Sequence, residues 1–222
     1  MEKLANRISL RIASELSFDN DRREVIEYGL IALMQTVLVI AIVIVLGFIL
    51  GIFTEAVIIS LGVSVLRKYS GGAHASSIAS CTIISTILCI SFAFLGRYLA
   101  DVKLPDVVII SAAVLTYLFA VVIVLYKVPV DSPNKPVTSE SKRRRLKIKT
   151  FIVIAVYFVV SAVSFFFRHH QGLPESVFIC ILISILWQMG TLTGPGKYLV
   201  EGSDRLVYRI ITLKGGHSNN EN

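Results

Sequence analysis

The sequence predicts an all-α polytopic membrane protein, with about six transmembrane helices and an N-terminal amphipathic helix at the membrane interface. Three observations support this fold class. Of the 222 residues 55% are hydrophobic, the mean hydropathy is +0.74, and the 17% that are charged fall in blocks between long apolar runs. A soluble domain of this length cannot bury so much apolar surface, whereas a bundle that faces lipid does not need to bury it.

The first 28 residues are charged and lack the apolar core of a cleavable signal peptide. Apolar residues recur there at every fourth position, at Leu4, Ile8, Ile12 and Leu16. This spacing predicts an amphipathic helix within segment 1–28. Two placements fit it equally well: the helix lies in the membrane interface beside anionic lipid, or it packs on the protein's own surface.

A membrane domain is expected over residues 29–193. Its apolar runs cover residues 30–50, 52–66, 77–99, 107–126, 151–167 and 177–192. A helix needs about 20 residues to cross the hydrocarbon layer, so the second run is short. It either begins earlier, within residues 47–51, or the bilayer thins around it. The remaining residues, 194–222, are expected to form a polar tail.

The positions of the basic residues predict how the chain is oriented across the membrane. Of the 22 Lys and Arg residues, all but Arg97, Lys103 and Arg168 fall in the N-terminal segment, in alternate loops or in the tail. By the positive-inside rule both termini are cytoplasmic, as is the long loop 128–149 with its basic run. Because this charge follows the topology and forms no soluble basic face, it favours anionic lipid or acidic peptide as partners and disfavours nucleic acid.

The stretch 67–81 carries the chemistry of interest, because it holds His74 and Cys81 after a pair of glycines. A thiol attacks as the thiolate, and an imidazole and a helix N-terminus both favour that form. In one straight helix the two residues would stand about 10.5 Å apart along the axis. We therefore expect the helix to begin near Ser76 or Ser77, with His74 in the preceding turn.

Spacing alone leaves other functions open. Cys89 and Cys180 lie within apolar runs and are expected to be small buried hydrophobes outside any disulfide framework. No cofactor is expected, and no metal, because no further Cys or carboxylate lies close to the His74–Cys81 pair in sequence. A non-enzymatic transporter or scaffold is the alternative. A transporter is disfavoured because the apolar runs carry almost no charge away from their ends.

The stretch 67–81, with Gly72-Ala73-His74 and the seven-residue step to Cys81, resembles the accessory gene regulator protein B (AgrB) family, bacterial membrane peptidases that process quorum-sensing propeptides. The proline-bounded segment 128–136 is a second point of likeness. The resemblance implies that Cys81 is the nucleophile and His74 the general base and acid. Arg67 and Gly72 occupy positions that the family tends to keep. The resemblance also implies a homodimer in the bacterial cell membrane.

The resemblance further implies a propeptide substrate with an amphipathic leader, a central Cys or Ser and an acidic tail. Cys81 would form a thioester with the signal segment, and ring closure to a thiolactone or lactone would follow. Gln35 is similar to a polar residue of the family and has two readings, an interhelical hydrogen bond or an oxyanion or orienting group. Asp131 is a distant candidate for a third catalytic residue. Together with Arg67, three arginines are candidates for attracting the acidic tail: Arg143, Arg144 and Arg145.

Overall fold

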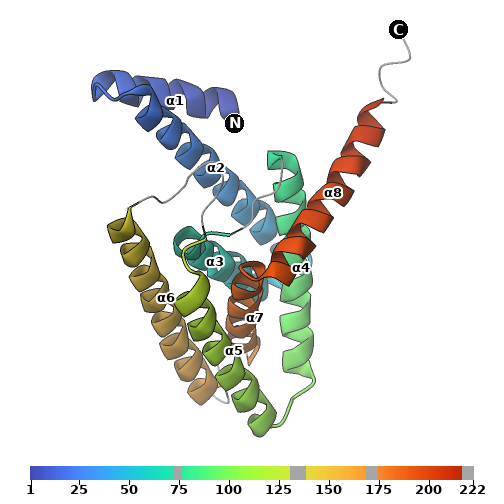
Figure 1. Ribbon diagram of the computed structural model, residues 1–222. Helices are drawn as coiled ribbons and strands as arrows, with labels where there is room; N and C mark the ends of the chain where they lie inside the picture. The colour runs from blue at the N-terminus through green and yellow to red at the C-terminus, as the bar shows by residue number, and fades with distance from the viewer. Residues whose placement is uncertain (73–76, 131–138, 169–174, 217–222) are drawn as a thin grey trace.

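The structure is a computed structural model and describes residues 1–72, 77–130, 139–168 and 175–216. Within these ranges the chain forms eight helices (Figure 1). Their bounds are α1 Glu2–Glu15, α2 Asn20–Ile49, α3 Phe53–Ser70, α4 Ile78–Asp101, α5 Asp106–Lys127, α6 Glu140–Phe167, α7 Glu175–Thr191 and α8 Gly194–Gly216. The predicted fold class, an all-α polytopic membrane protein, is confirmed.

The N-terminal helix α1 packs on α2 through a face of small residues, Ala5, Ser9 and Ala13. The apolar stripe seen in the sequence points elsewhere: Leu4 and Leu16 are more than half exposed. The protein's own surface therefore takes the small face of α1, and the larger apolar side chains stay on the outside. The small face of α1 therefore packs on the protein, as one of the two placements expects, while its apolar stripe stays available for the membrane interface, as the other expects.

Helix α2 begins well before the first apolar run. The Asp19 side chain caps it by accepting a 3.0 Å hydrogen bond from the backbone N–H of Arg22. With 30 residues α2 is about 45 Å long, more than the hydrocarbon thickness of a bilayer. Its polar first turns therefore extend beyond the apolar part of the bundle and carry α1.

Four described helices are long and apolar enough to span a membrane, namely α2, α4, α5 and α6. Helices α7 and α8 meet the same criterion only as a pair, which is bent by 89°. Helix α3 has 18 residues and carries Glu55, Arg67 and Lys68 near its ends. Length and composition thus give four or five spans, where the hydropathy runs predicted about six.

Helices α3 and α7 lie at the centre of the bundle and make its most extensive helix–helix contact (Figure 1). Most residues of α7 are buried against the surrounding helices. Small residues allow the backbones to approach closely: a Cβ atom on Gly62 of α3 would lie 2.8 Å from Ser184 Oγ, and one on Gly96 of α4 would collide with Cys180 Sγ. These close approaches hold α3 and α7 together at the centre of the bundle.

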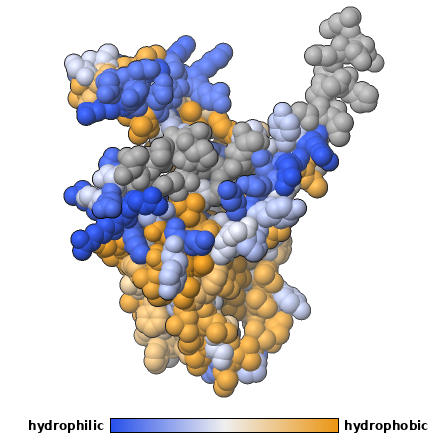
Figure 2. Space-filling model, viewed as in Figure 1, coloured by the Kyte–Doolittle hydropathy of each residue, from blue (hydrophilic) through white to orange (hydrophobic). Residues whose placement is uncertain are grey.

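The two ends of the bundle differ in polarity. Helices α1 and α8 and the first turns of α4 and α6 gather at one end, here called the α1 end (Figure 1). Figure 2 shows hydrophilic residues at this end and a mostly apolar surface below it. The basic residues of α1, α8 and the start of α6 therefore share one end, as the positive-inside reading of the sequence requires.

At the opposite end a buried carboxylate joins three helices. Glu55 of α3, whose exposed fraction is 3%, accepts a 2.7 Å hydrogen bond from Ser176 Oγ of α7. The guanidinium of Arg97 on α4 lies 3.8 Å from the same carboxylate and donates to the Gly51 carbonyl. A buried carboxylate is tolerated when it is paired and hydrogen-bonded in this way.

Helix α8 was not predicted, because segment 194–222 reads as a polar tail. Its start follows ordinary capping rules: Thr193 Oγ1 accepts a 3.2 Å hydrogen bond from the Gly196 N–H, and Pro195 occupies the first turn. After the 89° bend α8 packs against α4 and α7.

Candidate functional site

The first turn of α4 presents Cys81. Ser77 has extended backbone and caps the helix, because its Oγ accepts a 3.0 Å hydrogen bond from the Ser80 N–H. The Cys81 N–H donates to the Ser77 carbonyl and closes the first helical turn. The expectation that this helix begins at Ser76 or Ser77 is therefore confirmed, and the thiol lies near a helix N-terminus, where an anion is favoured.

Gln35 of α2 helps to define where α4 begins. Its Nε2 donates a hydrogen bond of 3.3 Å to the carbonyl of Ile78, the first residue of α4. This is the interhelical hydrogen bond that one of its two readings expects. Its effect on the site is to hold the turn that carries Cys81.

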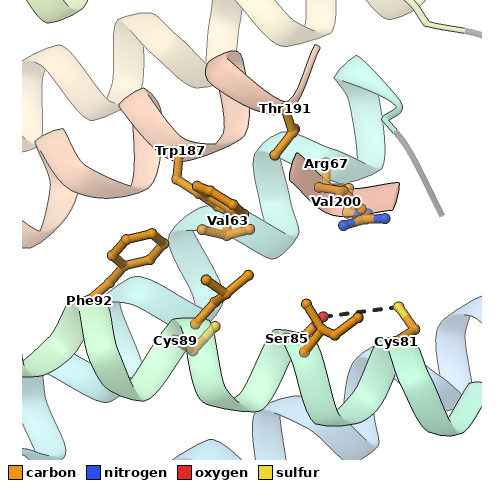
Figure 3. Close-up of a pocket in the computed structure, with 11 residues that line it drawn as sticks. Val63, Arg67, Cys81, Ser85, Cys89, Phe92, Trp187, Thr191 and Val200 are labelled. Atoms are coloured by element: carbon orange, nitrogen blue, oxygen red, sulfur yellow. Dashed lines mark hydrogen bonds between the residues drawn. The ribbon is translucent and has the colours of Figure 1, made fainter. Parts of the chain in front are cut away.

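Cys81 opens onto a cleft between α3, α4, α7 and α8 (Figure 3). One face of α4, from Cys81 to Phe92, forms one wall. The other walls come from Val63 and Arg67 of α3, Trp187 and Thr191 of α7, and Val200 of α8. The empty volume of the cleft, its open side included, is about 520 Å³. The unpredicted helix α8 thus contributes directly to the surroundings of Cys81.

The three cysteines differ in accessibility, and all are free thiols. Cys81 is partly exposed, and its Sγ lies 4.0 Å from Ser85 Oγ one turn further along α4 (Figure 3). Cys89 and Cys180 are buried, with exposed fractions of 8% and 0%. This agrees with their expected role as small buried hydrophobes. Cys81 is the thiol that a peptide can reach.

The glycine pair after α3 brings the two characteristic segments of the sequence together. Gly71 has φ +77°, and a Cβ atom there would collide with the carbonyl oxygen of Val130. The two residues form an isolated parallel bridge, and the Val130 N–H donates a 3.0 Å hydrogen bond to the Ser70 carbonyl. The end of α3 and the segment after α5 are therefore joined beside the entrance to α4.

Gln188 of α7 also contacts this junction, and it was not identified as a site residue from the sequence. Its exposed fraction is 1%, and its Nε2 donates 3.0 Å hydrogen bonds to Ser70 Oγ and to the Gly71 carbonyl. Gly72 is buried beside it. A long amide inside the apolar run 177–192 is the signal that could have identified it, because such a group needs partners within the bundle.

The structure brings some of the predicted residues together and separates others. Arg67 and Cys81 line the same cleft, whereas Gly72 lies in the adjoining turn. The exposed arginines at the start of α6, Arg143, Arg144 and Arg145, do not line the cleft, because α4 and α6 lie on opposite sides of α3 and α7 (Figure 1). His74 and Asp131 lie outside the described residues.

The part of the chain that the structure describes contains no group of three His, Cys, Asp or Glu side chains arranged to hold a metal ion. The chemistry open to the described residues is that of a partly exposed thiol at a helix N-terminus. A guanidinium and a hydroxyl line the same cleft. These groups can support attack on a carbonyl and can attract an anionic group.

Comparison with known proteins shows similarity along nearly the whole chain. A family profile described as Accessory gene regulator B matches residues 3–192. An AgrB-like protein of Clostridium perfringens strain SM101 is 34% identical over 95% of this chain and 100% of its own length. AgrB-like protein 2 of Clostridium perfringens strain 13 is 32% identical over the same shares of the two chains. An AgrB-like protein of Listeria innocua is 26% identical over 57% of this chain and 59% of its own length. No solved structure matches the chain. The matched range includes α1 to α7 and three of the four walls of the cleft.

Proposed function

Because the chain belongs to the accessory gene regulator B family, we propose that it is a membrane cysteine endopeptidase that removes the C-terminal tail of a quorum-sensing propeptide. Membership of this family supports a part in processing that peptide. The observation that carries the finer proposal is the position of Cys81. It is the partly exposed thiol of the three, in the first turn of α4 and at the wall of a cleft.

The proposed reaction has two acyl transfers. The Cys81 thiol passes its proton to His74, and the thiolate attacks the carbonyl that joins the signal segment to the tail. The C–N bond breaks, His74 returns the proton to the departing amine, and the signal segment remains on Cys81 as a thioester. The substrate's own thiol then passes its proton to His74 and attacks that thioester, which closes the ring and releases the Cys81 thiolate, and His74 can return this proton to Cys81. A central Ser would give a lactone in the same way.

Substitution of Cys81 tests the proposal. In the purified full chain, reconstituted in lipid, Cys81→Ser should abolish release of the tail, because a hydroxyl is a far weaker nucleophile than a thiol. Loss of the thioester should be visible by mass spectrometry of the intact protein with its substrate. Cys89→Ser is the matched control on the same helix and should still cleave. A transporter or scaffold, the competing function, would tolerate Cys81→Ser, and full processing by that variant would exclude the peptidase.

We also propose that basic residues at the end of α3 and the start of α6 attract the acidic tail. Arg67 lines the cleft, and the ammonium groups of Lys68 and Lys149 each lie 5.7 Å from the ring centre of Tyr69. These contacts link the end of α3 to the basic first turns of α6. Cations in the first turn of a helix oppose the helix dipole by about 0.3–1 kcal/mol, so Lys142 and Arg143 do not stabilise α6 through this dipole.

We propose that the α1 end, both termini and the cleft entrance lie on the cytoplasmic side of the bacterial cell membrane. The basic residues gathered at that end support the orientation. The exposed apolar stripe of α1 and the basic run of α6 would both lie at the level of anionic lipid headgroups. A homodimer is part of the same proposal and follows from the family resemblance.

A further inference from the structure

The cleft beside Cys81 is graded in polarity. Its polar lining residues, Arg67, Cys81, Ser85 and Thr191, lie toward the α1 end (Figure 3). Along α4 the lining then becomes apolar, from Leu88 to Phe92. Cys81 and Phe92 are eleven residues apart, which corresponds to about 16 Å along a helix axis. The cleft is therefore long enough to take a side chain inward from the thiol.

Two aromatic rings lie at the inner end of the cleft. The rings of Phe92 and Trp187 lie with their centres 5.1 Å apart and form its floor (Figure 3). One turn further along α4, Gly96 meets Cys180 so closely that a Cβ atom would not fit between the helices. On α4 the described lining of the cleft ends at Phe92, so the space is an apolar recess that extends inward from the thiol.

We propose that this recess is the subsite for the side chain of the residue whose carbonyl Cys81 attacks, and that it selects a large apolar side chain, aromatic or long aliphatic. The proposal rests on the proposed function. A carbonyl carbon within bonding distance of Cys81 Sγ has its own side chain only two bonds away, so that side chain must lie against the walls next to the thiol. The walls that extend inward from this point are Leu88, Phe92 and Trp187.

The position of Arg67 in the cleft determines which part of the peptide can enter the recess. Among the described residues that line the cleft, Arg67 is the charged one, and it lies on the polar side. A carboxylate can meet Arg67 there, but on the floor it would lose its water without gaining a partner. Burial of an apolar side chain on the floor is favourable by about 25 cal/mol per Å². The acyl side of the scissile bond therefore points inward, and the acidic leaving side stays at the entrance.

Trp187 is the single tryptophan of the chain, which provides a binding signal that does not need catalysis. The uncleaving variant Cys81→Ala, as the full chain in lipid nanodiscs, is titrated with propeptides that differ only in the residue before the scissile bond. Phe or Leu at that position should change the Trp187 emission and bind about tenfold more tightly than Ala or Asp. Equal binding of the Phe and Asp peptides would overturn the proposal.

A substitution in the recess provides the second arm, measured as cleavage by the chain with Cys81 intact. Leu88→Phe fills the recess and should lower cleavage of the Phe and Leu substrates about tenfold while leaving the Ala substrate within about twofold. Ile87→Phe is the matched control, because Ile87 is the adjacent residue of α4, is 58% exposed and does not line the cleft. It should not change the ratio between substrates.

The outcomes separate this proposal from the proposed function. If Cys81→Ala still cleaves, the proposed function fails. If cleavage requires Cys81 but Leu88→Phe lowers it equally for every substrate, the function stands and the recess has another occupant, such as a lipid chain, which overturns the subsite. A changed ratio in Leu88→Phe, together with an unchanged ratio in Ile87→Phe, supports the subsite.

Discussion

At Gly71, directly after α3, the backbone has no room for the methyl group of an alanine. Gly71 combines a positive φ with direct contact to the Val130 carbonyl, and its own carbonyl accepts a hydrogen bond from Gln188. Both constraints act on the backbone that leads into the segment with His74. The site therefore depends on residues that take no part in bond making.

Gly71→Ala should lower the stability of the fold and reduce tail cleavage. The positive φ alone costs an alanine roughly 1–3 kcal/mol, and the contact with Val130 adds to this. The measurement is thermal unfolding in one detergent, followed by the cleavage assay. Gly29→Ala is the control, because Gly29 lies within α2 with open space around it, and alanine favours a helix there by about 1 kcal/mol. Equal melting temperatures for the two variants would show that the turn is not constrained.

At the scale of elements, the sequence best predicted the features that depend on residues close together in the chain. The serine that caps α4 and the apolar stripe of α1 both follow from short-range rules, and both were found. The nucleophile was singled out by its neighbourhood in the sequence. The thiol in the first turn of α4 is consistent with that choice, whereas the catalytic pairing with His74 stays a prediction.

Other parts depended on packing that no local pattern contains. Helix α8 reads as a polar tail because its packing depends on the bend after α7 and on contact with α4, which is distant in the sequence. The hydropathy runs predicted about six spans because α3 and α7 each contain an apolar run, but α3 carries three charged residues and α7 has 17 residues and meets the criterion only together with α8. Gln188 was overlooked because its partners, Ser70 and Gly71, lie on another helix.

The contact between α3 and α7 provides a test at this scale. Gly62→Ala should destabilise the bundle by roughly 1–3 kcal/mol, because the new methyl group meets the side chain of Ser184. Ser184→Gly removes that side chain, so the double variant should recover more stability than the sum of the two single changes predicts. The free energies of unfolding of the four proteins form the cycle. Strict additivity would mean that the two helices are not in contact at this point.

At the scale of the whole molecule, charge is concentrated at one end. Reversal of the arginines at the start of α6, as the triple variant R143E/R144E/R145E, should slow processing at low salt by roughly tenfold, because it removes attraction for an acidic tail. Raised salt should slow the parent protein and reduce the difference, since exposed charges more than about 8 Å apart are already largely screened at physiological ionic strength. The control R7E/R11E reverses charges on α1 at the same end. Unchanged cleavage by a correctly inserted triple variant would remove this role.

Orientation across the membrane is testable with two cysteines, introduced one at a time into a Cys81→Ala background whose remaining thiols, Cys89 and Cys180, are buried. Lys103 lies after α4 at the end opposite α1, and Arg144 lies at the start of α6. Both positions are exposed. A membrane-impermeant maleimide should label Lys103→Cys in intact cells and Arg144→Cys only after the membrane is opened. The reverse pattern would place the cleft entrance outside the cell.

The central position of α7 has a consequence for biosynthesis. A ribosome delivers this helix after α2 to α6 have already entered the bilayer, yet it fills the middle of the bundle and supplies Ser176 to the buried Glu55. Until it arrives, the five earlier helices must enclose lipid or a chaperone where α7 will lie, with a carboxylate that lacks its hydroxyl partner. A nascent chain halted before residue 175 should therefore be an early substrate for membrane quality-control proteases, and completed chains should escape them.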